Sequence, residues 1–180
     1  MYKYVLTGGH GVGKTSIILG LQLAGEEVIR ESASDYQYYQ RAKGNIFPFD
    51  CSDAENEVLS IQIERENALL KKNAIRAFLD RSVIDHFVYS KILRHPISDE
   101  LLAHAKNRFY DIVFLIEHMP NNGISLCTKR EQEYSRLIQE ETRKEYAKRG
   151  FDIISIKNNS LENRMNDILK ITMEYESNRL

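Results

Sequence analysis

An α/β fold, with a parallel sheet covered by helices on both faces, is the fold class that this 180-residue sequence predicts. Short β-type segments alternate with helical segments along the whole chain, as in a parallel sheet with crossover helices. Residues 110–117, Tyr-Asp-Ile-Val-Phe-Leu-Ile-Glu, are apolar without alternation, which is typical of a strand buried on both faces. Right-handed crossovers would place a ligand at the C-terminal ends of the strands.

Strands are predicted where short apolar runs end at polar or glycine-rich segments. The first precedes a glycine-rich turn, the third ends in Asp80, and the last follows Gly150, which ends a helix. No internal repeat, low-complexity tract or linker divides the chain, so residues 1–180 are predicted to form one domain. The five expected strands are 2–7, 26–31, 74–80, 110–117 and 151–156.

Helices are predicted from apolar residues at helical spacing and from capping residues. Residues 44–50 and 118–127 are expected to be loops. The expected helices are 17–24, 32–43, 52–73, 82–95, 98–108, 128–148 and a last one from 160. The expected N-terminal caps are Ser52 with Glu55, Ser82 with Asp85, Thr128 with Glu131, Ser98 and Ser160.

The charge balance excludes a global positive field. Lysine and arginine number 25 and aspartate and glutamate 26, so neither nucleic acid nor an anionic membrane is expected as a partner. No apolar run approaches the ~20 residues of a membrane span, and no signal peptide is seen. Cys51 and Cys127 are far apart and are read as free thiols. The expected location is the cytoplasm.

Residues 8–15 read Gly-Gly-His-Gly-Val-Gly-Lys-Thr, which matches the phosphate-binding P-loop pattern between a strand and a helix. Glycines let backbone N–H groups point at phosphate oxygens, and the helix N-terminus adds positive charge. Lys14 would reach the β- and γ-phosphates of ATP, and the Thr15 hydroxyl would bind Mg²⁺. The predicted nucleotide-binding residues are Gly8, Gly9, His10, Gly11, Val12, Gly13, Lys14, Thr15 and Ser16.

Three charged residues at strand ends complete the predicted catalytic set with Lys14. Asp80 could hold Mg²⁺ opposite Thr15, and Arg81 could neutralise a transferring phosphoryl group. Glu31, at the end of the second strand, could accept the proton of an acceptor hydroxyl. The alternatives are an ion pair between Asp80 and Arg81, and an ordinary strand-end glutamate.

Residues 118–149 are the predicted lid region. Lys129 and Arg130 stand at the start of its helix and could close over phosphates, so Arg130 joins the catalytic candidates. Arg136 and Arg143 follow at seven-residue spacing with interleaved glutamates, which also fits a solvated, salt-bridged face.

Acceptor-binding residues are predicted on the long helix and near the aromatic loop. Gln62 and Arg65 share a helix face and could hydrogen-bond a base or phosphate, although a mixed surface face is the equal alternative. Aromatic side chains could stack on a flat acceptor or simply pack the loop onto the core. These aromatics are Tyr36, Tyr39, Phe47 and Phe49.

Several motifs occur in a familiar order. The P-loop is followed by Val-Ile-Arg-Glu-Ser-Ala at 28–33, Phe-Leu-Asp-Arg-Ser-x-x-Asp-x-x-x-Tyr at 78–89, the strand at 110–117, a basic helix and Gly-Phe-Asp-Ile-Ile at 150–154. Over nearly its whole length the chain resembles the small AAA-like P-loop ATPases related to the ribosylnicotinamide kinase domain of bacterial NAD-biosynthesis proteins. It is also similar to the broader nucleoside and nucleotide kinase group.

The resemblance implies a P-loop NTPase with a five-stranded parallel sheet in the order 2-3-1-4-5. It also implies that Glu31 is the base, that Asp80-Arg81-Ser82 is the acidic-Arg-Ser element, and that Asp85 and Tyr89 match residues after it. The chain departs from the pattern in the lid. Many AAA-like relatives carry Asp-Gly-Val-Arg there, whereas residues 122–125 read Asn-Gly-Ile-Ser.

Together these features predict an ATP·Mg²⁺-binding protein that transfers the γ-phosphoryl group to a small nucleoside-like or nucleotide acceptor. The alternative is a regulatory ATP- or GTP-binding NTPase that acts through a partner. A closed, aromatic-lined cavity between Glu31, the long helix and Arg81 would favour the kinase, and a shallow groove the switch. Lys-Asn-Asn-Ser at 157–160 lacks the order of a guanine-reading element, which favours ATP. A homodimer stays open.

Overall fold

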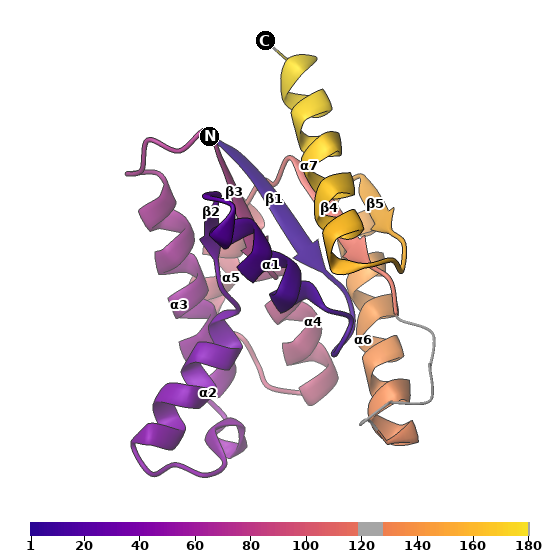
Figure 1. The fold of residues 1–180 in the computed structure, drawn as a ribbon. Coiled ribbons are helices and arrows are strands. Elements are labelled where there is room, and N and C mark those ends of the chain that lie inside the picture. The colour runs from indigo at the N-terminus through magenta and orange to yellow at the C-terminus, as the bar shows by residue number, and fades with distance from the viewer. Residues whose placement is uncertain (119–127, 180) are drawn as a thin grey trace.

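The computed structural model describes residues 1–118 and 128–179. Five strands form one parallel sheet in the order β2-β3-β1-β4-β5, so the predicted fold class and strand order are confirmed (Figure 1). The second strand is shorter than expected because residues 30 and 31 already lead into a helix. The strands are β1 (Tyr2–Thr7), β2 (Glu27–Ile29), β3 (Arg76–Asp80), β4 (Ile112–Ile116) and β5 (Ile153–Ile156).

The helices begin close to the expected capping residues. Ser82 and Thr128 each form the predicted capping box. The capping box predicted at Ser52 and Glu55 is wrong, because Asp53 precedes the first helical residue and no side chain caps that helix. A short 3₁₀ helix, η1 (Pro48–Asp50), lies in the expected loop. The α-helices are α1 (Lys14–Leu23), α2 (Ser32–Ala42), α3 (Ala54–Leu69), α4 (Val83–Leu93), α5 (Asp99–Lys106), α6 (Lys129–Lys148) and α7 (Leu161–Ser177).

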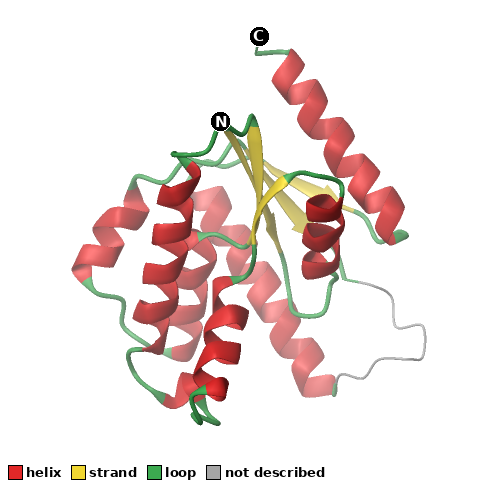
Figure 2. Cartoon of the chain, turned by 60° about the vertical axis from the view of Figure 1, so that its left-hand side comes forward, coloured by secondary structure: helices red, strands yellow, loops and turns green. Residues whose placement is uncertain are grey.

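Alternating side chains of the central strand β1 divide the core into two layers. Tyr4 and Leu6 pack with residues of α1 and α7, whereas Val5 packs with residues of α4 and α6 on the other face. Figure 2 shows the sheet between these helical layers. Within the described ranges, no helix is long and apolar enough to cross a bilayer. The packing on both faces fixes the C-terminal ends of the strands at one edge of the sheet.

A buried carboxylate joins three elements beside that edge. Asp85 of α4 is fully buried and accepts hydrogen bonds from the Thr7 hydroxyl at 2.5 Å and from the Tyr146 hydroxyl at 2.6 Å. The Ser82 backbone N–H also donates to it at 2.9 Å. Because buried charges need hydrogen-bond partners, these donors lock β1, α4 and α6 together under the glycine loop.

Replacing Tyr146 with phenylalanine should therefore destabilise the fold. Tyr146→Phe removes a donor to the buried Asp85 carboxylate and also the 2.6 Å hydrogen bond between the Tyr146 and Ser82 hydroxyls, and we expect the free energy of unfolding to fall by about 1.5–3 kcal/mol. Chemical denaturation followed by circular dichroism measures it. Tyr38→Phe is the matched control, because Tyr38 is 66% exposed and its change should stay within about 0.5 kcal/mol. Equal stability of the two variants would contradict the proposed role of Asp85 as a structural anchor.

Candidate functional site

The glycine loop lies between β1 and α1, at the C-terminal edge of the central strand. Gly8, Gly11 and Gly13 have positive φ angles of 135°, 72° and 91°. At Gly8 a side chain is excluded both by the positive φ and by space, because a Cβ would lie 2.7 Å from the carbonyl oxygen of Ile116. These glycines give the loop a conformation that L-residues with a Cβ rarely adopt, so that backbone amides and the start of α1 can face a phosphate.

Lys14 is held inside the loop that it would use to bind nucleotide. Its Nζ donates to the carbonyl oxygens of Gly9 at 2.7 Å and Gly8 at 3.3 Å, and the residue is buried. Burial, with the nearby Arg81 guanidinium, lowers the pKa of Lys14 to about 7. An ammonium group at this place would gain a strong partner from an incoming phosphate.

Thr15 and Asp80 form the candidate magnesium site. The Thr15 hydroxyl donates to Oδ2 of Asp80 at 2.8 Å, while Oδ1 of Asp80 is buried and has no hydrogen-bond partner among the described residues. Burial raises the pKa of Asp80. A hydroxyl and a carboxylate are oxygen ligands that suit Mg²⁺, which takes its other ligands from water and phosphate oxygens. The unpaired oxygen of a buried carboxylate fits a cation there.

Arg81 joins Glu31 to the glycine loop. Its Nε donates to Glu31 at 2.7 Å and its Nη1 donates to the Gly8 carbonyl at 3.0 Å. The described ion pairs of Arg81 are with Glu31 and Asp85, so the alternative of an ion pair with Asp80 is not found. Arg81 also has a φ of 68°, an unusual backbone conformation for a residue with a long side chain.

The Glu31 carboxylate is ionised and partly open to a cavity. Burial alone would raise the pKa of Glu31, but the Arg81 charge and hydrogen bonds from Ser34 and Arg81 outweigh it and lower the pKa to about 2. The Glu31 side chain is 19% exposed, whereas that of Arg81 is 2% exposed. Glu31 therefore contributes an ionised, partly exposed hydrogen-bond acceptor to the cavity lining.

A cavity of about 390 Å³ lies beside Glu31 and Arg81. Helices α2, α3, α4 and α6, the glycine loop and η1 all contribute to its walls, and three aromatic rings line it. The lining residues are His10, Glu31, Ala33, Ser34, Gln37, Phe49, Glu55, Arg81, His86, Tyr89, Leu93 and Tyr134.

Of the four aromatic residues predicted to stack on an acceptor, one lines the cavity. Phe49 faces it, and Tyr36 packs behind Phe49 with ring centroids 5.7 Å apart. Tyr39 and Phe47 are 64% and 68% exposed, and neither lines the cavity. Rings from two other helices, Tyr89 and Tyr134, take the expected place.

The two residues of α3 that were predicted to contact an acceptor do not line the cavity. Gln62 is fully buried, where its side chain accepts from Ser32 at 2.7 Å and donates to Glu66 at 3.0 Å. Arg65 pairs with Asp35 of α2 at 2.9 Å. Both groups are committed to packing α3 against its neighbours, and the cavity receives Glu55 from the first turn of the same helix instead.

Helix α6 contacts the glycine loop through its middle. Ser135 donates to the His10 carbonyl oxygen at 2.9 Å, and the His10 ring lies parallel to the Tyr134 ring at 6.0 Å. The His10 Nε2 and the Tyr89 hydroxyl are 3.1 Å apart. His10 thus forms part of the wall between the loop and the cavity, a role that its place in the motif alone does not reveal.

The basic start of α6 is exposed to solvent. Lys129 and Arg130 are exposed, and so are Arg136 and Arg143 further along the helix. The departure from the relatives' lid motif falls on residues 122–125, outside the described residues. A lid role for residues 118–149, with Arg130 on the phosphates, therefore stays a prediction.

Arg164 is a loop contact that no sequence motif indicates. It comes from α7, is 2% exposed, and donates to the Val12 carbonyl oxygen at 2.8 Å. A Cβ on Gly13 would lie 2.9 Å from its Nη2. Helix α7 thus contacts the phosphate loop through Arg164. The sequence could not predict this contact without the knowledge that α7 packs against α1.

The sheet order and the glycine loop at the end of β1 define a P-loop, kinase-like fold. The chain belongs to the AAA domain family, whose model matches residues 3–164. A search of curated proteins found no match.

Solved structures share the fold at low identity. A NadR protein in complex with NR matches with a TM-score of 0.73 and 15% identity over 97% of this chain. This chain spans 50% of the length of that NadR chain. Deoxyadenosine kinase from M. mycoides with bound dATP matches with a TM-score of 0.61 and 16% identity, over 96% of this chain and 99% of the kinase. Thymidylate kinase from Ehrlichia chaffeensis matches with a TM-score of 0.59 and 14% identity, over 95% of this chain and 98% of the kinase.

Lys14 and Thr15 should both be needed for tight Mg²⁺-nucleotide binding. Lys14→Ala and Thr15→Ala each remove a polar partner of the phosphate–metal group, so we expect ATP affinity to fall roughly 10- to 150-fold. Calorimetric titration with Mg²⁺ present measures it. Lys71→Ala is the control, because Lys71 is exposed outside the site. Wild-type affinity in both loop variants, with circular dichroism unchanged, would remove the loop from nucleotide binding.

Asp80 should contribute more to Mg²⁺ binding than to the binding of the phosphate groups of ATP. Asp80→Asn replaces an anionic ligand with a neutral one and leaves the backbone amides of the loop intact. We expect the gain in ATP affinity on adding Mg²⁺ to shrink about 10-fold or more, while affinity in excess chelator changes little. Equal losses with and without Mg²⁺ would show that Asp80 has a structural role instead.

Proposed function

We propose that this protein is a kinase that transfers the γ-phosphoryl group of ATP to a hydroxyl of a small nucleoside-like or nucleotide acceptor. The observation that carries the proposal is the cavity of about 390 Å³ that adjoins the glycine loop at His10 and contains Glu31 and Arg81. A second compartment beside the phosphate loop is where a kinase would hold its acceptor. The cavity is also the size of an ordinary small-molecule site.

The donor half of the proposed site consists of the loop amides, Lys14, Thr15 and Asp80. Mg²⁺ held by Thr15 and Asp80 would neutralise charge on the β- and γ-phosphate oxygens. ATP is preferred over GTP in this proposal because the sequence lacks a guanine-reading element. Support from known proteins is structural: one similar structure contains NR, and another is a deoxyadenosine kinase with dATP.

The acceptor half uses Glu31 and Arg81. The acceptor oxygen attacks the γ-phosphorus, the bond from that phosphorus to the bridging oxygen breaks, and ADP leaves. Glu31 takes the proton of the acceptor hydroxyl, and Arg81 keeps the Glu31 carboxylate turned toward that hydroxyl. A pKa of about 2 makes Glu31 a weak base, which suits a loose transition state in which the hydroxyl loses its proton late.

Glu31→Gln should slow transfer strongly and spare donor binding. Gln is nearly isosteric and loses no phosphate contact, so we expect ATP affinity within about twofold of the wild type. Acceptor-dependent ADP release should fall about 10²-fold or more, the usual contribution of a general base. A coupled assay with a panel of nucleosides and nucleotides as acceptors measures both.

Glu64→Gln on the exposed face of α3 is the matched control and should keep full activity. Acceptor stimulation that survives in Glu31→Gln would remove Glu31 from the mechanism while keeping the kinase. If no acceptor stimulates the wild type, the regulatory NTPase becomes the better description of the protein.

A further inference from the structure

A second pair of titratable side chains lines the cavity, where α3 meets α4. Glu55, in the first turn of α3, and His86, in α4, are 5% and 2% exposed. Oε2 of Glu55 lies 3.9 Å from Nδ1 of His86. The proposed phosphoryl transfer uses neither group, yet both belong to the cavity wall.

The pair differs from the structural carboxylate of the same helix. Glu66 lies near the other end of α3. It accepts hydrogen bonds from the Tyr110 hydroxyl at 3.0 Å and from the Gln62 side chain, and it forms an ion pair with Arg108. Glu55 has one ion pair within the described ranges, with His86, and that distance exceeds a hydrogen bond. A carboxylate buried only for packing would be expected to have more partners than this.

His86 also keeps an unused hydrogen-bonding atom. Its Nε2 is buried and has no partner among the described residues. An atom of this kind is unfavourable to leave unsatisfied, so the pair is not arranged to satisfy its own polar groups. His86 belongs to the lining of the cavity together with Glu55.

Glu55 defines the kind of partner that this part of the wall can bind. Its carboxylate oxygens accept hydrogen bonds. Because the contact with His86 is too long for a hydrogen bond, these oxygens remain available to a ligand in the cavity.

We infer that Glu55, with His86 beside it, recognises the acceptor by accepting hydrogen bonds from donors on it, and thereby selects donor-bearing acceptors. The inference rests on the proposed kinase function. Two parts of a nucleoside carry such donors: the amino group of its base and the vicinal hydroxyls of its ribose. The aromatic rings of Phe49 and Tyr89 in the same cavity suit the flat ring of such a molecule.

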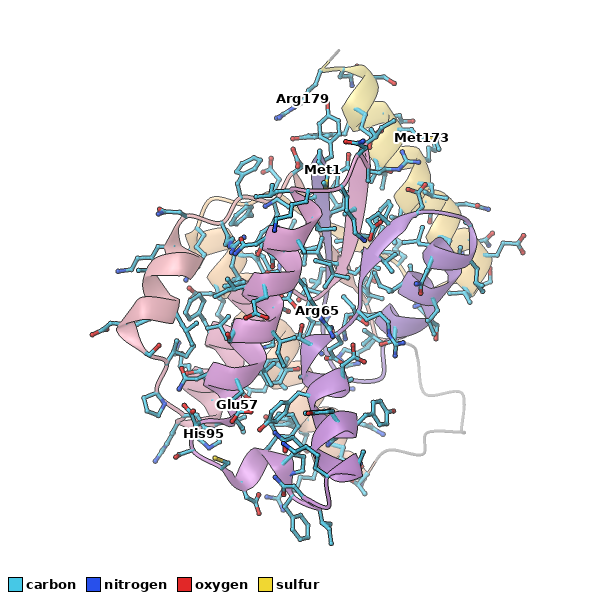
Figure 3. All side chains as sticks on the ribbon, turned by 90° about the vertical axis from the view of Figure 1, so that its left-hand side faces the viewer. Met1, Glu57, Arg65, His95, Met173 and Arg179 are labelled. Carbon is cyan, nitrogen blue, oxygen red and sulfur yellow. The ribbon has the colours of Figure 1, made fainter. Side chains whose placement is uncertain are left out.

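The test compares matched acceptors in matched variants. Adenosine against purine riboside, and cytidine against pyrimidin-2-one riboside, differ only in the amino group, while 2′- and 3′-deoxyadenosine lack one hydroxyl each. Acceptor-dependent kcat/KM and ATP affinity are measured for the wild type, Glu55→Gln and His86→Phe. Glu57→Gln and His95→Asn are controls, because neither residue belongs to the cavity lining. Figure 3 labels both residues.

We expect the wild type to favour the donor-bearing member of at least one series about 10-fold or more, the value of a hydrogen bond to a charged group. Glu55→Gln should reduce that preference to within about threefold and leave ATP affinity unchanged, and the controls should behave as the wild type. The series that loses its preference identifies the base or the ribose as the source of the donors.

Two results would overturn the inference. One is an equal loss of kcat/KM for every acceptor in Glu55→Gln and His86→Phe, which marks a structural pair. The other is full retention of the preference in both variants. If no acceptor stimulates ADP release, calorimetric titration with the same nucleosides tests the recognition role of Glu55 and His86 separately from the kinase proposal. A binding preference lost in Glu55→Gln supports the pair and rejects only the transfer, whereas absent binding rejects both.

Discussion

The buried guanidinium of Arg81 connects the parts of this site that lie far apart in the sequence. It stands just after β3, donates to Glu31 just after β2, and donates to the Gly8 carbonyl just after β1. An arginine that is 2% exposed needs such partners, since an unpaired buried charge is costly. The same contacts that satisfy Arg81 therefore fix the distance between the phosphate loop and the proposed base.

The surrounding charges divide into anchored and available groups. Asp85 is bound by donors from β1, from the N-cap of α4 and from α6. Glu66 is bound by Gln62 of its own helix and by Tyr110 just before β4. Asp80 keeps one oxygen unpaired beside Thr15, and His86 keeps one ring nitrogen unpaired at the cavity wall. The anchored groups make a rigid frame, and the available ones lie where the proposal needs magnesium and the acceptor.

Local patterns in the sequence predicted the parts of the fold that local chemistry decides. The strand–glycine loop–helix unit and the capping boxes at Ser82 and Thr128 depend on neighbouring residues, and they were found as predicted. The strand order came from the family resemblance rather than from spacing. The placement of Glu31 and Arg81 at adjacent strand ends follows from that order.

Contacts between distant elements could not be predicted in the same way. Gln62 was predicted either to contact an acceptor or to lie on a mixed surface face. It is instead buried, with hydrogen bonds to Ser32 of α2 and to Glu66. Arg164 reaches the loop across 152 residues of sequence. Glu55 was predicted as a capping partner of Ser52, but Asp53 is the residue that precedes the helix. Glu55 instead lines the cavity.

The most direct measurement follows the fate of the γ-phosphate. ATP labelled in that position is incubated with the protein, Mg²⁺ and each candidate nucleoside, and the products are separated. The kinase proposal predicts label on the acceptor, in an amount equal to the ADP formed, and its loss in Glu31→Gln. Label found solely as inorganic phosphate, released at a rate that no acceptor changes, would contradict it.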